Sequence, residues 1–167
     1  MNSDEKKKSG KRDRRRLVFH LVCLGLLPPL AACGKSGKST KSSIGIDVVV
    51  FSLLDRPILD IYLNDEDLGV AGKYGSTSVV TGIRVPMGEQ ALSWRLDGPR
   101  NTPRNGDTVK MKNKVILTAS VIPSNANYLS IHIYPDNTAD FNFTEFMPDL
   151  SARGEAILEA IEKNGQR

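Results

Sequence analysis

His132 is the only histidine beyond residue 32, and histidine is the side chain best suited to acid–base chemistry near neutral pH. In Ser130–Tyr134 the strand period of two places Ser130, His132 and Tyr134 on one face and two isoleucines on the other. A serine hydrolase needs a histidine beside a serine nucleophile and a carboxylate, and the sequence has no Gly-x-Ser-x-Gly turn to carry such a serine. We therefore expect His132 to be an exposed side chain on the polar face of a strand. The sequence predicts no enzyme.

Three consecutive acidic residues, Asp65, Glu66 and Asp67, could supply oxygen ligands for a calcium ion. An EF-hand loop requires oxygen ligands at alternate positions, glycine at the sixth and glutamate at the twelfth. Counted from Asp60, the twelfth position is Ala71, so the pattern is not met. The sequence predicts no metal and no cofactor. It predicts instead that the acidic residues form a solvated hairpin tip, which is a candidate contact for a basic protein partner.

The stretch 97–107 contains two prolines, two glycines and two arginines, Arg100 and Arg104. Prolines reduce the entropy that such a loop loses when it is ordered, and arginine is enriched among the residues that dominate binding energy at interfaces. The loop is therefore a second candidate for contact with a partner. An ordinary connection between two strands is an alternative of equal weight.

The start of the chain has the layout of a secretory signal peptide. Residues 1–16 hold eight Lys or Arg, Leu17–Leu27 is apolar, and Leu30-Ala-Ala-Cys33 follows two prolines. This arrangement resembles that of the bacterial lipoproteins, whose signal peptidase cuts before a cysteine that carries lipid. The resemblance implies that residues 1–32 are removed and that Cys33 is the lipidation site. The apolar stretch is shorter than the roughly 20 residues needed to span a bilayer.

Removal of residues 1–32 changes the charge of the chain. The full sequence has a formal charge of +4, but beyond residue 32 there are 15 basic and 16 acidic side chains. A nucleic-acid partner is therefore excluded, because it requires a basic surface. Lys35, two residues after Cys33, is not the aspartate that marks inner-membrane retention in enterobacterial lipoproteins. We expect an outer-membrane lipoprotein that faces the periplasm, with the inner membrane as the alternative.

The remaining sequence predicts one β-rich domain on a tether. Residues 33–43 are rich in Gly, Ser and Lys, which is typical of a flexible linker. Residues 44–167 form the domain, which we predict to be an antiparallel β-sandwich (immunoglobulin-like or similar) with one C-terminal helix lying on the sheet. Trp94, the sole tryptophan, is expected in the core. The predicted strands cover 44–54, 58–63, 78–85, 90–96, two segments within 109–122, 128–134 and 139–146.

The domain also resembles a family of small proteobacterial lipoproteins known as domain of unknown function 3304. The likeness lies in Leu54–Ile58, Leu92–Asp97, Lys114–Pro123 and Tyr128–Thr138, and it extends over roughly 44–146. Many members have a cysteine pair in mid-domain, which this chain lacks. The resemblance implies a binding role, because members are described beside phospholipase effectors of type VI secretion. Some lipoproteins of that kind are immunity proteins that occlude the toxin's active site.

Two hypotheses follow from these observations. In the first, the protein is a lipid-anchored immunity protein that neutralises a type VI secretion effector, with Asp65–Asp67, Arg100 and Arg104 as contact residues. In the second, it is a structural or assembly lipoprotein of the envelope, which docks on a larger complex through a sheet edge or its C-terminal helix.

Overall fold

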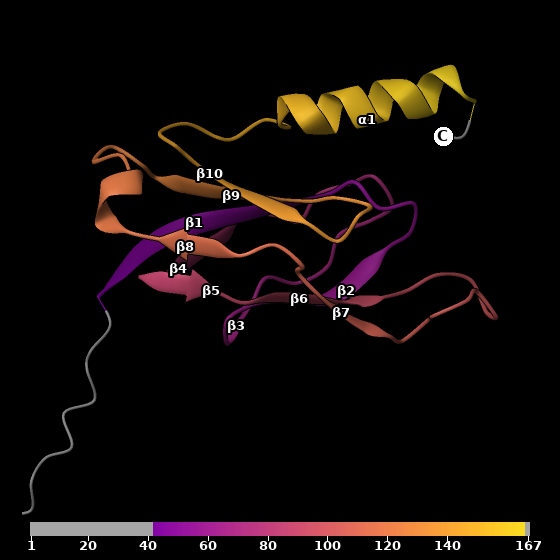
Figure 1. Cartoon of the computed structure of the whole chain (residues 1–167), viewed down its shortest axis with the longest axis horizontal. Helices are drawn as coiled ribbons and strands as arrows, with labels where there is room; N and C mark the ends of the chain where they lie inside the picture. Colours follow the sequence, from indigo (N-terminus) through magenta and orange to yellow (C-terminus); the bar gives the residue numbers. More distant parts are fainter. Residues whose placement is uncertain (1–41, 166–167) are drawn as a thin grey trace, which may run out of the picture. The chain divides into compact units, whose positions relative to one another are not determined.

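The computed structural model describes residues 42–165, which form β-sheets and one helix (Figure 1). The predicted signal peptide, Cys33 and most of the predicted tether lie outside the described residues. The elements are β1 (Ser43–Ser52), β2 (Ile58–Leu63), β3 (Glu66–Asp67), β4 (Val80–Pro86), β5 (Gly88–Gln90), β6 (Leu92–Leu96), β7 (Thr108–Lys110), β8 (Val115–Leu117), the 3-10 turn η1 (Ala119–Val121), β9 (Tyr128–Ile133), β10 (Ala139–Thr144) and α1 (Ala152–Lys163).

The strands form two four-stranded sheets and a short ribbon. The first sheet has the order β10-β9-β1-β4, the second has the order β3-β2-β6-β7, and β5 pairs with β8. Every named pair is antiparallel except β1 with β9, which is parallel. The prediction of a mainly β sandwich with one C-terminal helix is therefore confirmed. The parallel pair is a departure from a purely antiparallel arrangement that local patterns do not reveal.

The core lies between the two sheets and follows from the alternation along their strands. On β9, Leu129, Ile131 and Ile133 point into this core, and Val48 and Val50 do so from β1. Trp94 on β6 is fully buried among them, as predicted. Complete burial of one such large apolar side chain contributes roughly 1.5–3 kcal/mol relative to exposure, so this layer is the main source of stability.

In β2 an irregularity changes which side chains reach the core. Strict alternation would place Ile58 on the same face as Asp60 and Tyr62, but Ile58 is fully buried together with Ile61. The register of β2 against β6 shifts between Leu59 and Tyr62, and Asp60 has a positive φ of 47°. A bulge inserts an extra residue and turns the following side chains over. The exposed Asp60 then binds Arg95 of β6 at 2.6 Å.

Helix α1 starts with a serine cap and a close contact at a glycine. The Ser151 side chain accepts a hydrogen bond from the Gly154 backbone N–H at 3.1 Å, which satisfies one of the unpaired donors of the first turn. Gly154 is the only buried residue of the helix, and a Cβ atom there would lie 2.8 Å from two carbon atoms of Leu150. The glycine therefore allows Leu150 to fold back over the first turn. Figure 1 shows α1 running above β9 and β10.

Candidate functional site

The acidic residues lie at the hairpin tip that follows β2: Asp65 is in the turn, and Glu66 and Asp67 form β3. Asp65 and Asp67 are exposed, and Glu66 is half-exposed. The Asp67 carboxylate accepts a hydrogen bond from the Gly69 backbone N–H at 2.8 Å, which shapes the turn. The geometry is that of a hairpin tip whose remaining carboxylate groups can meet solvent or a partner.

The loop 97–107, which carries Arg100 and Arg104, is held by hydrogen bonds within the loop and by one from Arg56. Asn105 donates to the carbonyls of Gly98 and Pro99 at 3.0 and 2.9 Å, and Arg56 donates to the Pro103 carbonyl at 2.8 Å. Arg104 pairs with Asp107 at 3.1 Å and remains largely exposed, as does Arg100. The loop therefore presents its arginines from a defined backbone.

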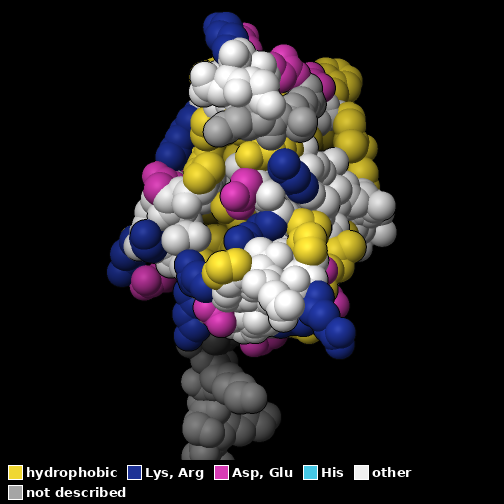
Figure 2. Space-filling view, turned by 90° about the vertical axis from the view of Figure 1, so that its right-hand side faces the viewer, with side chains coloured by type: hydrophobic (Ala, Val, Ile, Leu, Met, Phe, Trp, Pro, Cys, Tyr) yellow, Lys and Arg dark blue, Asp and Glu magenta, His cyan; other side chains and the backbone are white. Residues whose placement is uncertain are grey.

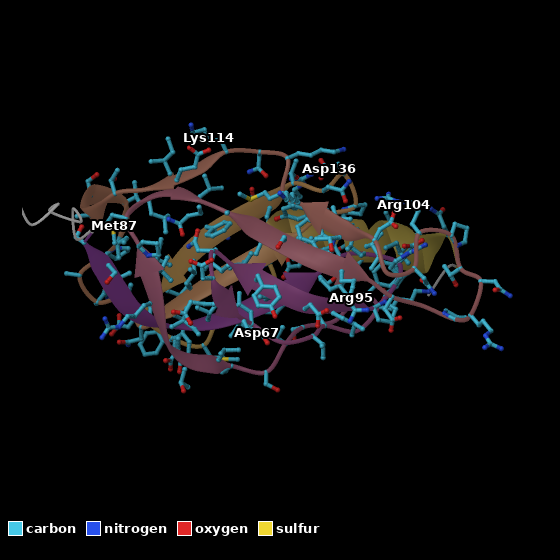
Figure 3. All side chains as sticks on the ribbon, turned by 90° about the horizontal axis from the view of Figure 1, so that it is seen from below. Asp67, Met87, Arg95, Arg104, Lys114 and Asp136 are labelled. Carbon is cyan, nitrogen blue, oxygen red and sulfur yellow. The ribbon has the colours of Figure 1, made fainter. Side chains whose placement is uncertain are left out.

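The structure places the two predicted contact sets at opposite ends of β2. The start of this strand pairs with Leu96, directly before the arginine loop, whereas its last residue, Leu63, pairs with Glu66 of the acidic tip. Six strand residues separate the two ends by about 17 Å. Figure 3 shows Asp67 and Arg104 well apart. One small partner surface cannot be centred on both sets.

An apolar groove lies at the end of the domain that carries the arginine loop. It has a volume of about 490 Å³ and separates α1 from the segment after β1. Figure 2 faces this end and shows hydrophobic side chains gathered beneath the helix, with charged groups around them. The lining comes from both sides of the groove: Leu53, Leu54, Asp55, Tyr74, Pro135, Ile157, Ala160, Ile161 and Asn164.

A smaller hollow adjoins the groove and connects it to the arginine loop. Its volume is about 180 Å³, it shares Leu54, Asp55 and Pro135 with the groove, and Arg56 and Arg104 line it. Of the predicted contact residues, Arg104 is therefore the one that lines this site. The helical spacing of Ile157 and Ile161 predicts an apolar stripe on α1, which forms one wall of the groove. No sequence pattern indicates that Leu53 and Leu54 lie opposite this stripe.

Tyr74 forms part of the polar rim of the groove. Its backbone N–H donates to the Leu54 carbonyl at 3.1 Å, and the Lys73 ammonium lies 5.0 Å from the centre of its ring. Partial burial, assisted by the Asp55 carboxylate, raises the pKa of the Tyr74 hydroxyl. A tyrosine hydroxyl is protonated at neutral pH even without this shift, so it is available as a hydrogen-bond donor at the rim.

His132 is buried, so the expectation of an exposed histidine is wrong. Only 1% of the residue is accessible, because the chain between β10 and α1 folds over the outer face of β9. Its ring stacks on Phe51 with centroids 4.9 Å apart, and its Nε2 atom accepts a hydrogen bond from the Ser151 backbone N–H at 3.0 Å. The polar face of this strand packs against the start of α1 and does not face solvent at His132.

Four side chains form what we call the anchor cluster: His132, Tyr134, Asp140 and Ser151. The Tyr134 hydroxyl donates to the Asp140 carboxylate at 2.9 Å and lies 2.9 Å from the Ser151 hydroxyl. Outside the cluster, the Arg153 guanidinium lies 3.7 Å above the Tyr134 ring and pairs with Asp136 at 2.8 Å. Together these contacts fix the first turn of α1 to β9 and β10.

The anchor cluster contains Ser, His and Asp but is not arranged as a catalytic triad. His132 binds the backbone N–H of Ser151 instead of its hydroxyl, and that hydroxyl caps the helix at Gly154. Burial lowers the pKa of His132, although the nearby Asp149 carbonyl and the Asp140 carboxylate oppose the effect. The neutral imidazole can accept the Ser151 hydrogen bond, so the cluster has a structural explanation.

Residues 42–165 contain neither a candidate metal site nor a candidate membrane-spanning helix. No group of three or more His, Cys, Asp or Glu side chains in this part is arranged to hold a metal ion. Within the same range, no helix is both long enough and apolar enough to cross a membrane. Cys33, the predicted lipidation site, lies outside the described residues, and its assignment stays a prediction.

Comparison with known proteins does not identify a family. No protein-family model matches the chain, and no curated protein matches it either. The resemblance to domain of unknown function 3304 therefore stays a prediction.

Proposed function

We propose that the protein is a membrane-anchored periplasmic lipoprotein whose domain binds another protein without catalysing a reaction. In this proposal it is an immunity protein against a phospholipase-type effector of type VI secretion. The observation that carries the proposal is the apolar groove beneath α1, with Arg104 and the arginine loop beside it. Protein interfaces combine such a desolvated centre with a polar rim, and arginine and tyrosine dominate their binding energy.

The groove suits a protein segment better than a small polar ligand. Leu53 and Leu54 are buried at its floor, and Ile157 and Ile161 of α1 are only partly covered. An apolar side chain of a partner that entered the groove would cover these isoleucines further. Asp55 is exposed at its edge and places an acidic group beside Arg56 and Arg104 of the adjoining hollow. These features support a partner with an apolar anchor residue flanked by charges of both signs.

The proposed lipid on Cys33 gives the binding domain its place of action. An outer-membrane anchor facing the periplasm would hold the domain beside the bilayer that a phospholipase attacks. Tethering raises the effective concentration of one binding partner near the other without any new contact. A modest affinity at the groove would then be sufficient for protection.

Co-expression with the product of the neighbouring gene tests the proposal. We expect a complex that survives purification and protection of cells that carry the effector in the periplasm. Ile161→Asp alters the groove and Arg104→Glu alters the adjoining hollow, and each should abolish the complex. Ile116→Asp, at a residue of β8 that is 54% exposed, should not. Circular dichroism checks that each variant is folded. Absence of a complex with the unaltered chain contradicts the immunity role.

The second candidate is a structural or assembly lipoprotein of the envelope, and the edge of β10 favours it. The strand lies at the end of its sheet, and the Asn113 side-chain amide pairs with both the N–H and the carbonyl of Ala139. Beyond Ala139, a strand from a partner could continue this pairing. Recovery of a multi-protein envelope complex from cells without any effector would support this role over the first.

A further inference from the structure

Phe146 and Met147 form an exposed apolar pair between β10 and α1. They are 75% and 55% exposed, and single exposed apolar residues are common, but two large adjacent ones are not. Their backbone is held in place, because the Thr144 hydroxyl donates to the Phe146 carbonyl at 2.8 Å and Asn127 donates to the Glu145 carbonyl at 2.9 Å. The fold therefore presents this pair to the outside from a fixed connection.

The apolar pair lies at the end of the domain where β1 begins. Strand pairing shows this, because Thr144 at the end of β10 is opposite Tyr128, and Tyr128 is opposite Asp47, the fifth residue of β1. The residues that follow Thr144 are therefore level with the first half of β1. Phe146 and Met147 also line a shared depression of about 550 Å³ with residues 45–47. In Figure 1 the connection from β10 to α1 turns at the end where β1 starts, and in Figure 3 Met87 marks this end while Arg104 lies toward the other.

The sequence that leads to this end is basic and short. Between Cys33 and Ser43 it contains Lys35, Lys38 and Lys41 and no acidic residue. In any conformation ten residues span at most about 36 Å, so a lipid on Cys33 keeps the start of β1 within that distance of the bilayer. Lysines close to a membrane surface are attracted to anionic lipids.

From these observations we propose that the β1 end of the domain rests on an anionic lipid surface, with Phe146 and Met147 inserted among the headgroups. The proposal extends the proposed function, because it assumes the lipid anchor on Cys33. Exposed apolar side chains on the domain, together with basic residues in the sequence that leads to β1, are a combination that favours binding to membrane interfaces. The groove beneath α1, at the opposite end, would then face the periplasm and any partner there.

Depth-dependent fluorescence quenching tests the inserted pair. The full chain, purified with its native anchor, is reconstituted in vesicles of phosphatidylcholine alone or with phosphatidylglycerol, in which the acyl chains are brominated. Phe146→Trp places a reporter in the pair. Val70→Trp is the matched control, because Val70 is 57% exposed and lies beside Ala71, which bridges to the start of β2. The signal of the buried Trp94 is subtracted with the unaltered chain.

In the brominated anionic vesicles we expect the reporter emission of the Phe146→Trp variant to shift to shorter wavelength and to fall at least about twofold. The control reporter of the Val70→Trp variant should not change. Replacing the three tether lysines with glutamine should reduce the quenching in the Phe146→Trp variant. An unquenched reporter at this position, in protein that stays bound to the vesicles, overturns this inference and leaves the anchor intact. The anchor is tested separately by labelling cells with a radioactive fatty acid: label on the unaltered chain that is lost in Cys33→Ser supports the anchor, and an unlabelled unaltered chain contradicts the proposed function.

Discussion

The domain has two buried interfaces that are stabilised in different ways. Between the sheets, apolar side chains such as Ile131 and Trp94 fill the space and depend on area and close packing. On the outer face of β9, the start of α1 is held by directional contacts of the anchor cluster, while Ile157 and Ile161 farther along remain partly exposed. The two sheets are thus held together by one continuous apolar core, whereas α1 is held mainly by the contacts at its first turn.

This difference bears on the proposed binding site. One wall of the groove belongs to the sandwich, through Leu53 and Leu54, and the other belongs to α1. Regions with few buried apolar contacts open at lower free energy than the core of a domain. We therefore expect the helix wall to adjust to a partner while the sandwich wall stays fixed.

The largest effect is expected in the core. Trp94→Ala should lower the free energy of unfolding by about 3–5 kcal/mol, because it removes a fully buried side chain and leaves a cavity. Trp94→Phe is the matched control. The Trp94 Nε1 atom is buried without a hydrogen-bond partner, so phenylalanine removes an unsatisfied donor as well as some volume. Urea denaturation should show a clearly smaller loss for Phe, and equal losses would contradict this account.

A smaller and more local effect is expected at the anchor cluster. His132→Phe keeps a ring beside Phe51 but leaves the partly buried Ser151 N–H without its acceptor, at a cost of about 1–3 kcal/mol. Hydrogen exchange measures where the cost appears. The amides of α1 should exchange faster while those of β1 and β9 keep their protection. Equal acceleration everywhere would show that α1 and the sandwich open as one unit.

Much of the fold could be predicted from local sequence patterns. The alternation in Tyr128–Tyr134 indicates a strand, and residues 135–138 form the turn to β10, with Asn137 at a φ of 65°, a conformation that asparagine tolerates. Ile58 shows the limit of this reasoning. Its face depends on a bulge at Asp60, and the bulge reflects pairing with β6, which local spacing does not encode.

The candidate site was harder to predict, because it depends on what covers each surface. Alternation shows that His132 lies opposite the isoleucines of β9, but it does not distinguish a face that meets water from one that meets a helix. The separation of Asp67 from Arg104 likewise depends on which strands pair. The sequence therefore indicated residues suited to binding, and only the tertiary structure shows which of them lie beside a groove.

The anchor cluster also predicts how stability changes with pH. Burial lowers the pKa of His132 below its ordinary value of 6.5 in the folded state, so the unfolded chain takes up a proton first as the pH falls. This contribution is complete above about pH 6.5 and is lost below it, by at most about 1.4 kcal/mol per pH unit. Urea denaturation at pH 7.5, 6.5 and 5.5 should show the loss. His132→Phe should remove it, and an unchanged slope in that variant would assign it to other groups.

The smallest effect is expected at the exposed edge of the α1 interface, where Arg153 meets Asp136. Both side chains are about half exposed, so Arg153→Ala should lower the free energy of unfolding by no more than about 1 kcal/mol. The pKa of Asp136 is about 2, first because the Thr138 hydroxyl and backbone N–H donate to its carboxylate and only then because of Arg153. Thr138→Val should therefore raise this pKa more than Arg153→Ala does, as followed by NMR titration of the carboxyl carbon. The reverse order would mean that the ion pair, and not the turn, holds Asp136 in its charged form, and that the helix contributes more to this edge than its exposure indicates.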